Sequence, residues 1–198
     1  MAKGRPREFD TEQALDRAME LFWRKGYEGT SLSDLTETLG ITRPSLYAAF
    51  GNKERLFRTV LKRYEEKVVT YRPKALNAPT SHEVARELLE GAAKLFGDKS
   101  KPAGCLGVQG ALARGEDADP IRLELIANRT AGEHAIRQRL ERAKTEGDLP
   151  ADSDPASLAR YLSAVLYGMA VLSAGGSSRR ELLQVAKMAL QNWPGRAN

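Results

Sequence analysis

Residues 39–56 read LGITRPSLYAAFGNKERL, and this stretch decides the fold of the N-terminal third of the chain. Gly40 ends one short helical pattern, and Thr42 caps the next one. Pro44 falls in the first turn of that next helix, where its missing N–H costs nothing. Asn52 then caps a further helix that continues toward Pro73. Two short helices joined by a tight glycine turn predict a helix-turn-helix.

Helical patterns also lie on both sides of this stretch. A first helix is expected between Asp10, its N-cap, and Gly26, and a second begins at Thr30 or Ser31. Beyond a linker at residues 77–80, helical patterns follow one another, and β-branched residues never gather into alternating runs. The expected helices lie near residues 81–97, 104–114, 119–147, 154–174 and 178–192.

The predicted fold class is therefore all-α, with about nine helices. Residues 1–56 form an N-terminal helix-turn-helix three-helix domain, preceded over residues 1–8 by a flexible basic arm. Residues 57–198 form a helical domain for ligand binding and dimerisation; both of these roles are implied only by the family resemblance given below.

Charge is distributed unevenly along the 198 residues, whose net charge is +5. Residues 1–74 hold 15 Lys and Arg against 11 Asp and Glu, which places most of the excess at one end. A positive N-terminal third suits a polyanion such as DNA, and ordinary scatter is the alternative. The longest uncharged apolar run, residues 161–174, is too short to cross a bilayer. We therefore expect a soluble, cytoplasmic protein without a membrane partner.

The start of the second helix of the motif is the part that meets base edges in the major groove of DNA. Here the four residues are Thr42, Arg43, Pro44 and Ser45. Arg43 can hold O6 and N7 of a guanine with its planar fork. Tyr47 follows one turn later and can reach a phosphate or a thymine methyl; its alternative is a core aromatic.

Further candidate contacts go to phosphates and to the minor groove. Lys53 opposes the macrodipole at the start of its helix, which is sensible if a phosphate lies there; a solvated surface lysine is the alternative. Thr30 and Ser31 offer hydroxyl and N–H groups for a second phosphate clamp. The basic arm carries the three expected minor-groove side chains, Lys3, Arg5 and Arg7, unless it is only a disordered tail.

These motifs carry a family resemblance. Residues 26–32, GYEGTSL, and the Leu-Tyr-x-x-Phe-x-x-Lys-x-x-Leu pattern of residues 46–56 resemble the N-terminal domain of the TetR family of bacterial repressors. Thr36 departs from the alanine usual there, which affects local packing alone. The resemblance implies a homodimer on a palindromic DNA operator, usually repressing, and released when an unknown small-molecule effector binds the C-terminal domain.

The last two expected helices are the most apolar, and the first of them must be covered on more than one side. The resemblance implies that they pair with their twofold mates in a four-helix bundle. The expected interface residues are Leu158, Leu162, Val165, Leu166, Met169, Leu182, Val185 and Ala189, with ordinary core as the alternative for some of them.

The ligand pocket is less defined by the sequence. Apolar residues that either line it or belong to the core are Leu88, Leu89, Phe96, Leu106, Leu112, Leu125 and Ile126. Of these, we select Phe96, Leu106, Leu125 and Ile126, together with Cys105, as the sensing residues.

Cys105 also supports a different signal, thiol-based sensing of electrophiles or oxidants. It follows Gly104 at the expected start of a helix, where N–H groups stabilise a thiolate; packing is the commoner role of such a cysteine. Gly104-Cys105-Leu106 resembles a signature of one TetR subgroup.

Two other classes of protein are disfavoured. His82 and His134 lie far apart, and a single cysteine cannot form a metal cluster, so we predict no enzyme, no cofactor and no metal. A DNA-packaging protein would need more positive charge and less chain beyond the DNA-binding domain.

Overall fold

The computed structural model describes residues 10–109 and 119–194, and over these ranges it contains ten helices and no strand. This confirms the all-α class, and Tyr71–Leu76 is the helix of the described residues that was not among those expected. Lys3, Arg5, Arg7 and Leu112 lie outside the described residues. The helices are α1 (Thr11–Lys25), α2 (Leu32–Leu39), α3 (Arg43–Phe50), α4 (Lys53–Lys67), α5 (Tyr71–Leu76), α6 (Ser81–Phe96), α7 (Leu106–Gln109), α8 (Asp119–Thr145), α9 (Pro155–Ala174) and α10 (Arg179–Gln191).

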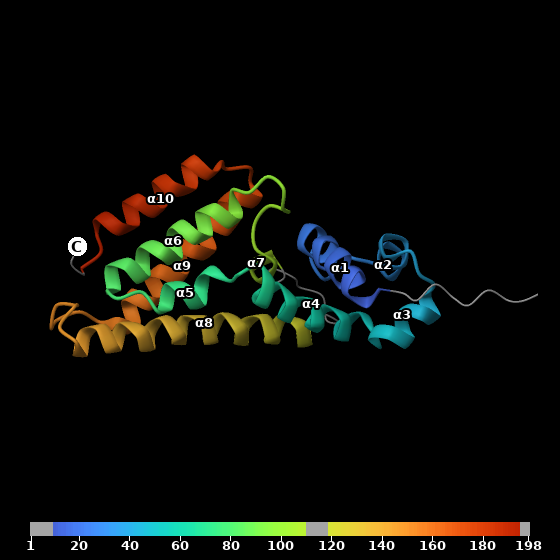
Figure 1. Ribbon diagram of the computed structural model, residues 1–198, viewed down its shortest axis with the longest axis horizontal. Coiled ribbons are helices and arrows are strands. Elements are labelled where there is room, and N and C mark those ends of the chain that lie inside the picture. Colours follow the sequence, from blue (N-terminus) through green and yellow to red (C-terminus); the bar gives the residue numbers. More distant parts are fainter. Residues whose placement is uncertain (1–9, 110–118, 195–198) are drawn as a thin grey trace, which may run out of the picture.

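The first three helices gather at one end of an elongated molecule, and α4 leads from them to the rest (Figure 1). Their starts are fixed by the caps that the sequence predicts: Asp10 accepts hydrogen bonds from the N–H groups of Glu12 and Gln13, at 3.0 and 3.2 Å. An aromatic cluster fills the interior. The ring of Phe57 lies 5.0 Å from that of Phe22 and 5.2 Å from that of Tyr27, both edge-to-face.

A charged clamp holds α4 against α1. Arg63 is buried, and its guanidinium donates to both carboxylate oxygens of Asp16, at 2.6 and 2.8 Å. It also donates to a carboxylate oxygen of Glu12 at 2.7 Å. These hydrogen bonds lower the pKa of the Asp16 carboxyl. The clamp therefore joins the DNA-binding end to the helix that leads out of it.

Replacing Arg63 with Met is expected to lower the free energy of unfolding at pH 7 by about 1–3 kcal/mol, because the carboxylates that lose their partner stay largely exposed and screened. A carboxyl whose pKa is lowered by folding stabilises the folded state at pH values above its unfolded pKa, which is about 3.9 for Asp. This stabilisation is lost as the pH falls through the lower pKa of the folded state. Urea unfolding between pH 3 and 7 should thus show a constant difference near neutrality that shrinks in acid.

Arg24 provides the control, because its bond to Glu20 is made between two exposed side chains of one helix, 3.4 Å apart. Arg24→Met should change the unfolding free energy by less than about 0.5 kcal/mol. Equal effects of the two substitutions would contradict the role of the clamp.

The helix α5 is the one that the sequence interpretation missed. A single helix was expected from Asn52 toward Pro73, but α4 ends at Lys67 and a new six-residue helix starts at Tyr71. Pro73 lies in the first turn of α5, where the N–H groups lack intrahelical partners in any case. The proline that appeared to end one helix thus belongs to the start of the next.

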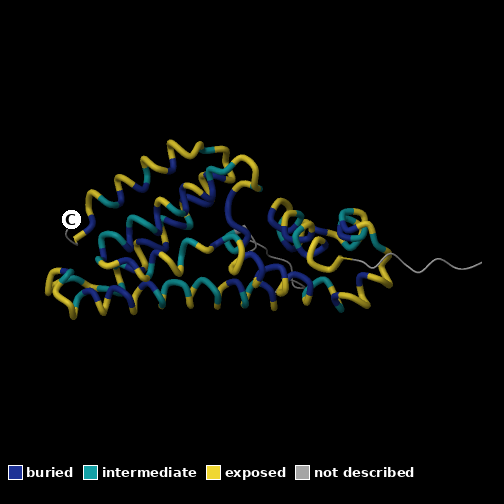
Figure 2. The backbone as a smooth tube through the Cα atoms, in the orientation of Figure 1, coloured by how far each residue is buried: buried dark blue, intermediate teal, exposed yellow. Residues whose placement is uncertain are grey.

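The helices after α4 form a bundle in which α9 packs against α6, α8 and α10. By length and composition α9 alone among the described helices resembles a membrane span. Its buried side chains, which include Leu162, Leu166 and Met169, account for much of this apolar character as core. Figure 2 shows that α10, by contrast, is exposed along much of its length.

Hydrogen bonds join the N-terminal helices to the bundle through the segment between α6 and α7. The indole N–H of Trp23 on α1 donates to the carbonyl of Gly104 at 3.1 Å. The N–H of Gly104 donates to the Ser173 hydroxyl on α9 at 3.1 Å, and that hydroxyl donates to the Phe96 carbonyl at 2.7 Å. A salt bridge also joins α4 to α8, where Arg58 donates to Glu124 at 2.6 Å.

Candidate nucleic-acid interface and ligand cavity

The N-terminus of α3 lies at the surface with its polar side chains fixed by local bonds. Thr42 is the N-cap and accepts from the N–H of Ser45 at 3.3 Å, while the two hydroxyls lie 2.9 Å apart. The Arg43 guanidinium donates to the Ser33 hydroxyl of α2 at 3.0 Å. Tyr47 is 46% exposed, which excludes its core alternative. These side chains project together with Pro44 from one end of the molecule.

Thr30 and Ser31 differ sharply in their surroundings. The Thr30 hydroxyl is buried and donates to the Gly26 carbonyl at 2.7 Å, so it does not face a phosphate. Ser31 is the exposed N-cap of α2 and forms a reciprocal capping box with Asp34. Ser31 is therefore the hydroxyl of this pair that lies at the surface.

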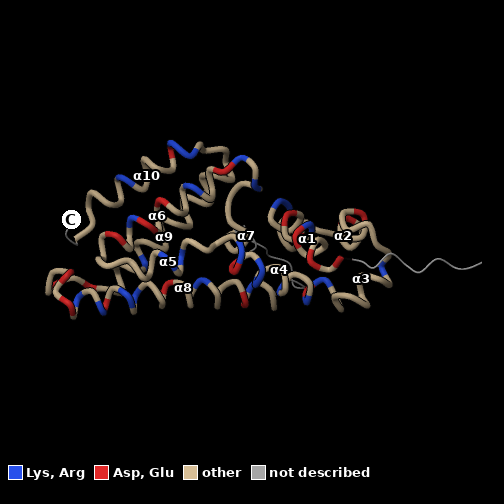
Figure 3. The backbone as a smooth tube through the Cα atoms, viewed as in Figure 1, with Lys and Arg blue, Asp and Glu red and all other residues tan. Residues whose placement is uncertain are grey.

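Lys53 begins α4 and lies over an aromatic ring. Its ammonium is 4.3 Å from the centroid of the Tyr27 ring, a cation–π geometry. Burial lowers the pKa of Lys53, against the opposing carboxylates of Glu28 and Asp34. The lysine is thus held in place and partly desolvated, unlike a freely solvated surface lysine. The helix α3 itself carries no acidic residue (Figure 3).

The predicted interface residues of α9 and α10 fall into two groups. Leu162, Leu166, Met169, Leu182 and Ala189 are buried within the chain, while Leu158, Val165 and Val185 are partly exposed. A shallow groove between the two helices is lined by Tyr161, Val165, Leu172, Val185, Met188 and Ala189, among others.

Three of these groove residues, Tyr161, Leu172 and Met188, were not among the predicted interface residues. Their side chains are 40%, 45% and 60% exposed. A second apolar stripe on α9, with residues 161, 165 and 172 on one face, is the sequence signal that could have found the first two.

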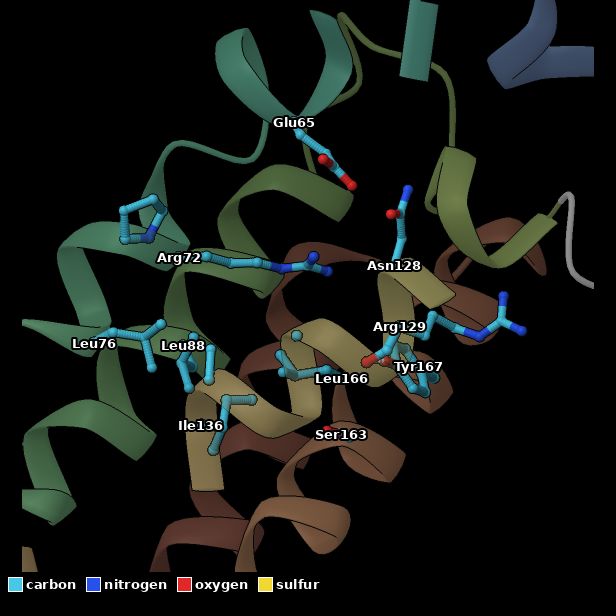
Figure 4. A pocket seen from close by; sticks show the side chains of 13 residues that line it. Glu65, Arg72, Leu76, Leu88, Asn128, Arg129, Ile136, Ser163, Leu166 and Tyr167 are labelled. Carbon is cyan, nitrogen blue, oxygen red and sulfur yellow. Dashed lines mark hydrogen bonds between the residues drawn. The ribbon is translucent and has the colours of Figure 1, made fainter. Parts of the chain in front are cut away.

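A cavity of about 270 Å³ lies between α4, α5, α6, α8 and α9. Figure 4 shows its polar side, where Arg72 extends from α5 toward Glu65 and Asn128, and its apolar side, with Leu76 and Ile136. The complete lining is Glu65, Arg72, Pro73, Leu76, Leu88, Asn128, Arg129, Gly132, Ala135, Ile136, Ser163, Leu166 and Tyr167. An amphipathic small molecule suits such a mixed lining.

The residues that sequence reasoning assigned to sensing lie elsewhere. Phe96, Leu106 and Leu125 are buried in the core outside the lining of this cavity, and Ile126 is on the exposed side of α8. Cys105 is 4% exposed, and the Tyr64 hydroxyl donates to its Sγ at 3.5 Å. Of the wider set of apolar candidates, Leu88 lines the cavity, as does Leu166 from the predicted interface.

Two family models match the chain. Residues 14–60 match the bacterial regulatory proteins of the tetR family, and residues 84–188 match the tetracyclin repressor-like C-terminal domain. The HTH-type transcriptional repressor ComR of Escherichia coli (strain K12) is 35% identical over 195 residues, which cover 98% of this chain and 93% of that protein. The repressor BdcR of the same organism is 32% identical over 190 residues, covering 94% of this chain and 90% of that protein.

A solved structure resembles the whole chain as well. It contains a cysteine mutant of the TetR family transcriptional regulator CifR in complex with 26-bp double-strand operator DNA. Its TM-score is 0.91 and its sequence identity 42%, covering 96% of this chain and 100% of that chain. These relatives are regulators of transcription, which confirms that the protein is not an enzyme. The chain therefore belongs to the TetR family of DNA-binding transcriptional regulators.

Proposed function

We propose that the protein is a repressor that binds a palindromic operator as a homodimer and is released when a small molecule occupies the cavity. The observation that carries this proposal is the separation of two surfaces on one chain. Arg43, Ser45 and Tyr47 project from α3 at one end, and the cavity lies beside α4, the helix that leads to them. The groove between α9 and α10 supplies the apolar face on which a second copy would pack.

Selection of preferred sites from a pool of random double-stranded DNA tests this function. The recovered sites should show dyad symmetry, with half-sites in successive major grooves or wider. Light scattering at micromolar concentration should give twice the mass of the 21.8-kDa chain. Sites without symmetry, or a strictly monomeric protein, would contradict the proposal. Because the operator is chromosomal or plasmid DNA, we place the protein in the cytoplasm.

For DNA recognition we propose contacts from Ser31, Thr42, Arg43, Pro44, Ser45, Tyr47 and Lys53, and from the arm residues Lys3, Arg5 and Arg7, but not from the buried Thr30. Arg43→Ala should cost about 1–3 kcal/mol and relax preference at one base position, because it removes a direct base contact. Lys53→Ala should weaken all sequences alike and reduce the salt slope by about one, because it removes a phosphate contact.

Fluorescence anisotropy on the selected operator and its single-base variants, at several salt concentrations, measures both effects. Arg24→Ala, an exposed arginine on α1, is the matched control and should leave base preference unchanged. If Lys53→Ala changed base preference and Arg43→Ala did not, the two roles would be reversed.

The second candidate for the signal is the thiol of Cys105. Its position in the chain favours this signal, because Cys105 directly follows Gly104. The carbonyl of Gly104 accepts a hydrogen bond from Trp23 at the DNA-binding end. An adduct on this buried sulfur would break its bond with Tyr64 and force its neighbours apart. Its burial argues for the opposite outcome, since an electrophile must first reach it.

If the cavity holds the signal, Cys105 is unreactive in the native protein. N-ethylmaleimide should then have the same effect on the operator affinity of wild type and of Cys105→Ser. Mass spectrometry of the native and the urea-unfolded protein gives the labelling, and anisotropy gives the release. Rapid native labelling together with release from wild type alone would favour the thiol signal over the cavity.

A further inference from the structure

Arg72 is the feature of the cavity that points to a class of ligand. It is half-buried at the second residue of α5, and its guanidinium lies on the polar side of the cavity. The hydroxyl of the neighbouring Tyr71 and the carboxylate of Glu65 both interact with this guanidinium, but among the described residues it forms no salt bridge with a carboxylate. The Tyr71 hydroxyl carries no charge, so an incoming anion would supply the close counter-charge that this partly buried guanidinium lacks.

The other charged residues of the lining leave the cavity positive. Arg129 donates to the Gly107 carbonyl at 3.1 Å, a bond that fixes its side chain but does not neutralise it. Glu65 is the one acidic residue of the lining; partial burial raises the pKa of its carboxyl, and attraction to Arg72 opposes that rise. Two arginines and one glutamate give a formal charge of +1, which favours an anion of single charge.

The far side of the cavity is mainly apolar. Leu76, Leu88 and Ile136 come from three different helices and line the part of the cavity away from Glu65 and Asn128. Leu166 and Ala135 continue this apolar wall. A ligand that fills the space of about 270 Å³ thus presents an apolar body to one side and its charge to Arg72 on the other.

We propose that the effector is a small monocarboxylate with an apolar body, bound with its carboxylate on Arg72 and its apolar body against Leu76, Leu88 and Ile136. The planar guanidinium matches a carboxylate through two parallel hydrogen bonds. Asn128 lies on the same side and can donate to the carboxylate. This inference rests on the proposed function, since it names the ligand of the cavity to which that function assigns the signal.

A matched panel tests the charge requirement. Calorimetry on the full-length protein should detect butanoate, hexanoate, octanoate, benzoate or phenylacetate, and should detect the corresponding primary amides and amines at least tenfold more weakly. Hexyl phosphate is included because arginine also binds phosphates. Tighter binding of the amides, the amines or the phosphate, or no binding of any carboxylate, would overturn the proposal.

Substitutions test the position of the charge. Arg72→Met should weaken carboxylate binding about ten- to a hundredfold, and Arg72→Lys should recover part of it. Glu65→Gln should strengthen binding, because it removes the negative charge of the lining. Arg137→Met, on the exposed side of α8, is the control and should change nothing. Carboxylate binding that survives Arg72→Met in a protein that still binds operator would place the anion elsewhere.

A further variant separates this proposal from the proposed function. A Cβ added at Gly132 meets open space, so Gly132→Leu should fill the cavity while improving the helix propensity of α8. Ala131→Leu, on an exposed position beside it, is the matched control. A neutral or cationic compound that releases operator from wild type and not from Gly132→Leu would refute the carboxylate and keep the cavity. Release that is insensitive to Gly132→Leu would refute the cavity as the sensor.

Discussion

Glutamate in place of Leu172 or Met188 is expected to convert the protein to monomers and to weaken operator binding by about 10²–10⁴-fold. Both side chains are exposed in the groove between α9 and α10, where the proposed dimer would bury them. A charge buried there without a partner opposes association. In a dimer, binding of one copy to its half-site holds the second copy at a high effective concentration near the other half-site. Separate monomers lose this advantage, which accounts for the size of the loss in affinity.

Sedimentation and anisotropy on full-length and half-site operators measure this effect. Leu123→Glu is the matched control, because Leu123 is 58% exposed on α8, away from the groove. The Leu123 variant should remain dimeric, and half-site affinity should be similar in all variants. A Met188→Glu protein that stayed dimeric would show that another face holds the two copies together.

Replacing Phe57 with Ala is expected to destabilise the DNA-binding end by about 3–5 kcal/mol, the cost of removing a fully buried phenylalanine. The ring contacts both Phe22 and Tyr27, and Tyr27 is the platform beneath Lys53. The loss should therefore reach the proposed phosphate contact as well as the core. Chemical unfolding followed by circular dichroism gives the stability, and anisotropy on the folded fraction gives operator affinity.

Tyr47→Ala is the counterpart in the same domain. Its ring is largely exposed, so the substitution should change stability by less than about 0.5 kcal/mol while weakening operator binding. If Tyr47→Ala were the more destabilising of the two, the assignment of one aromatic to the core and the other to DNA would be wrong.

The N-terminal domain was predictable because its signals are local. Asp10, Ser31, Thr42 and Asn52 cap their helices through side-chain bonds to residues at most three positions away, and such short-range chemistry can be read along the chain. The prediction failed at α5 for a related reason. Pro73 fits either the end of one helix or the first turn of another, and sequence alone does not distinguish the two.

The cavity was not predictable because its lining comes from five helices that meet only in the folded chain. Arg72 carries no motif, and nothing local shows that its guanidinium faces Asn128, 56 positions further on. Periodicity identifies which residues avoid water, as it did for Leu106 and Leu125, but a core wall and a cavity wall have the same period. The groove on α9 shows the same limit, since inner and outer apolar stripes share one helix.

The hydrogen-bonded connection through Gly104 has a consequence for how the protein tolerates sequence change. At Gly104 and Phe96 the bonds use main-chain atoms, which substitution leaves in place, so only Trp23 and Ser173 contribute side chains to the link. Gly104 itself has φ +77°, a conformation that other residues adopt at a cost. In a dimer paired through α9, coupling between the paired helices and the DNA-binding end by this route therefore depends on two side chains. Substitution of Trp23 or Ser173 would therefore break this link between operator binding and the arrangement of the helical bundle. The remaining contacts at the DNA-binding end and within the bundle would stay in place.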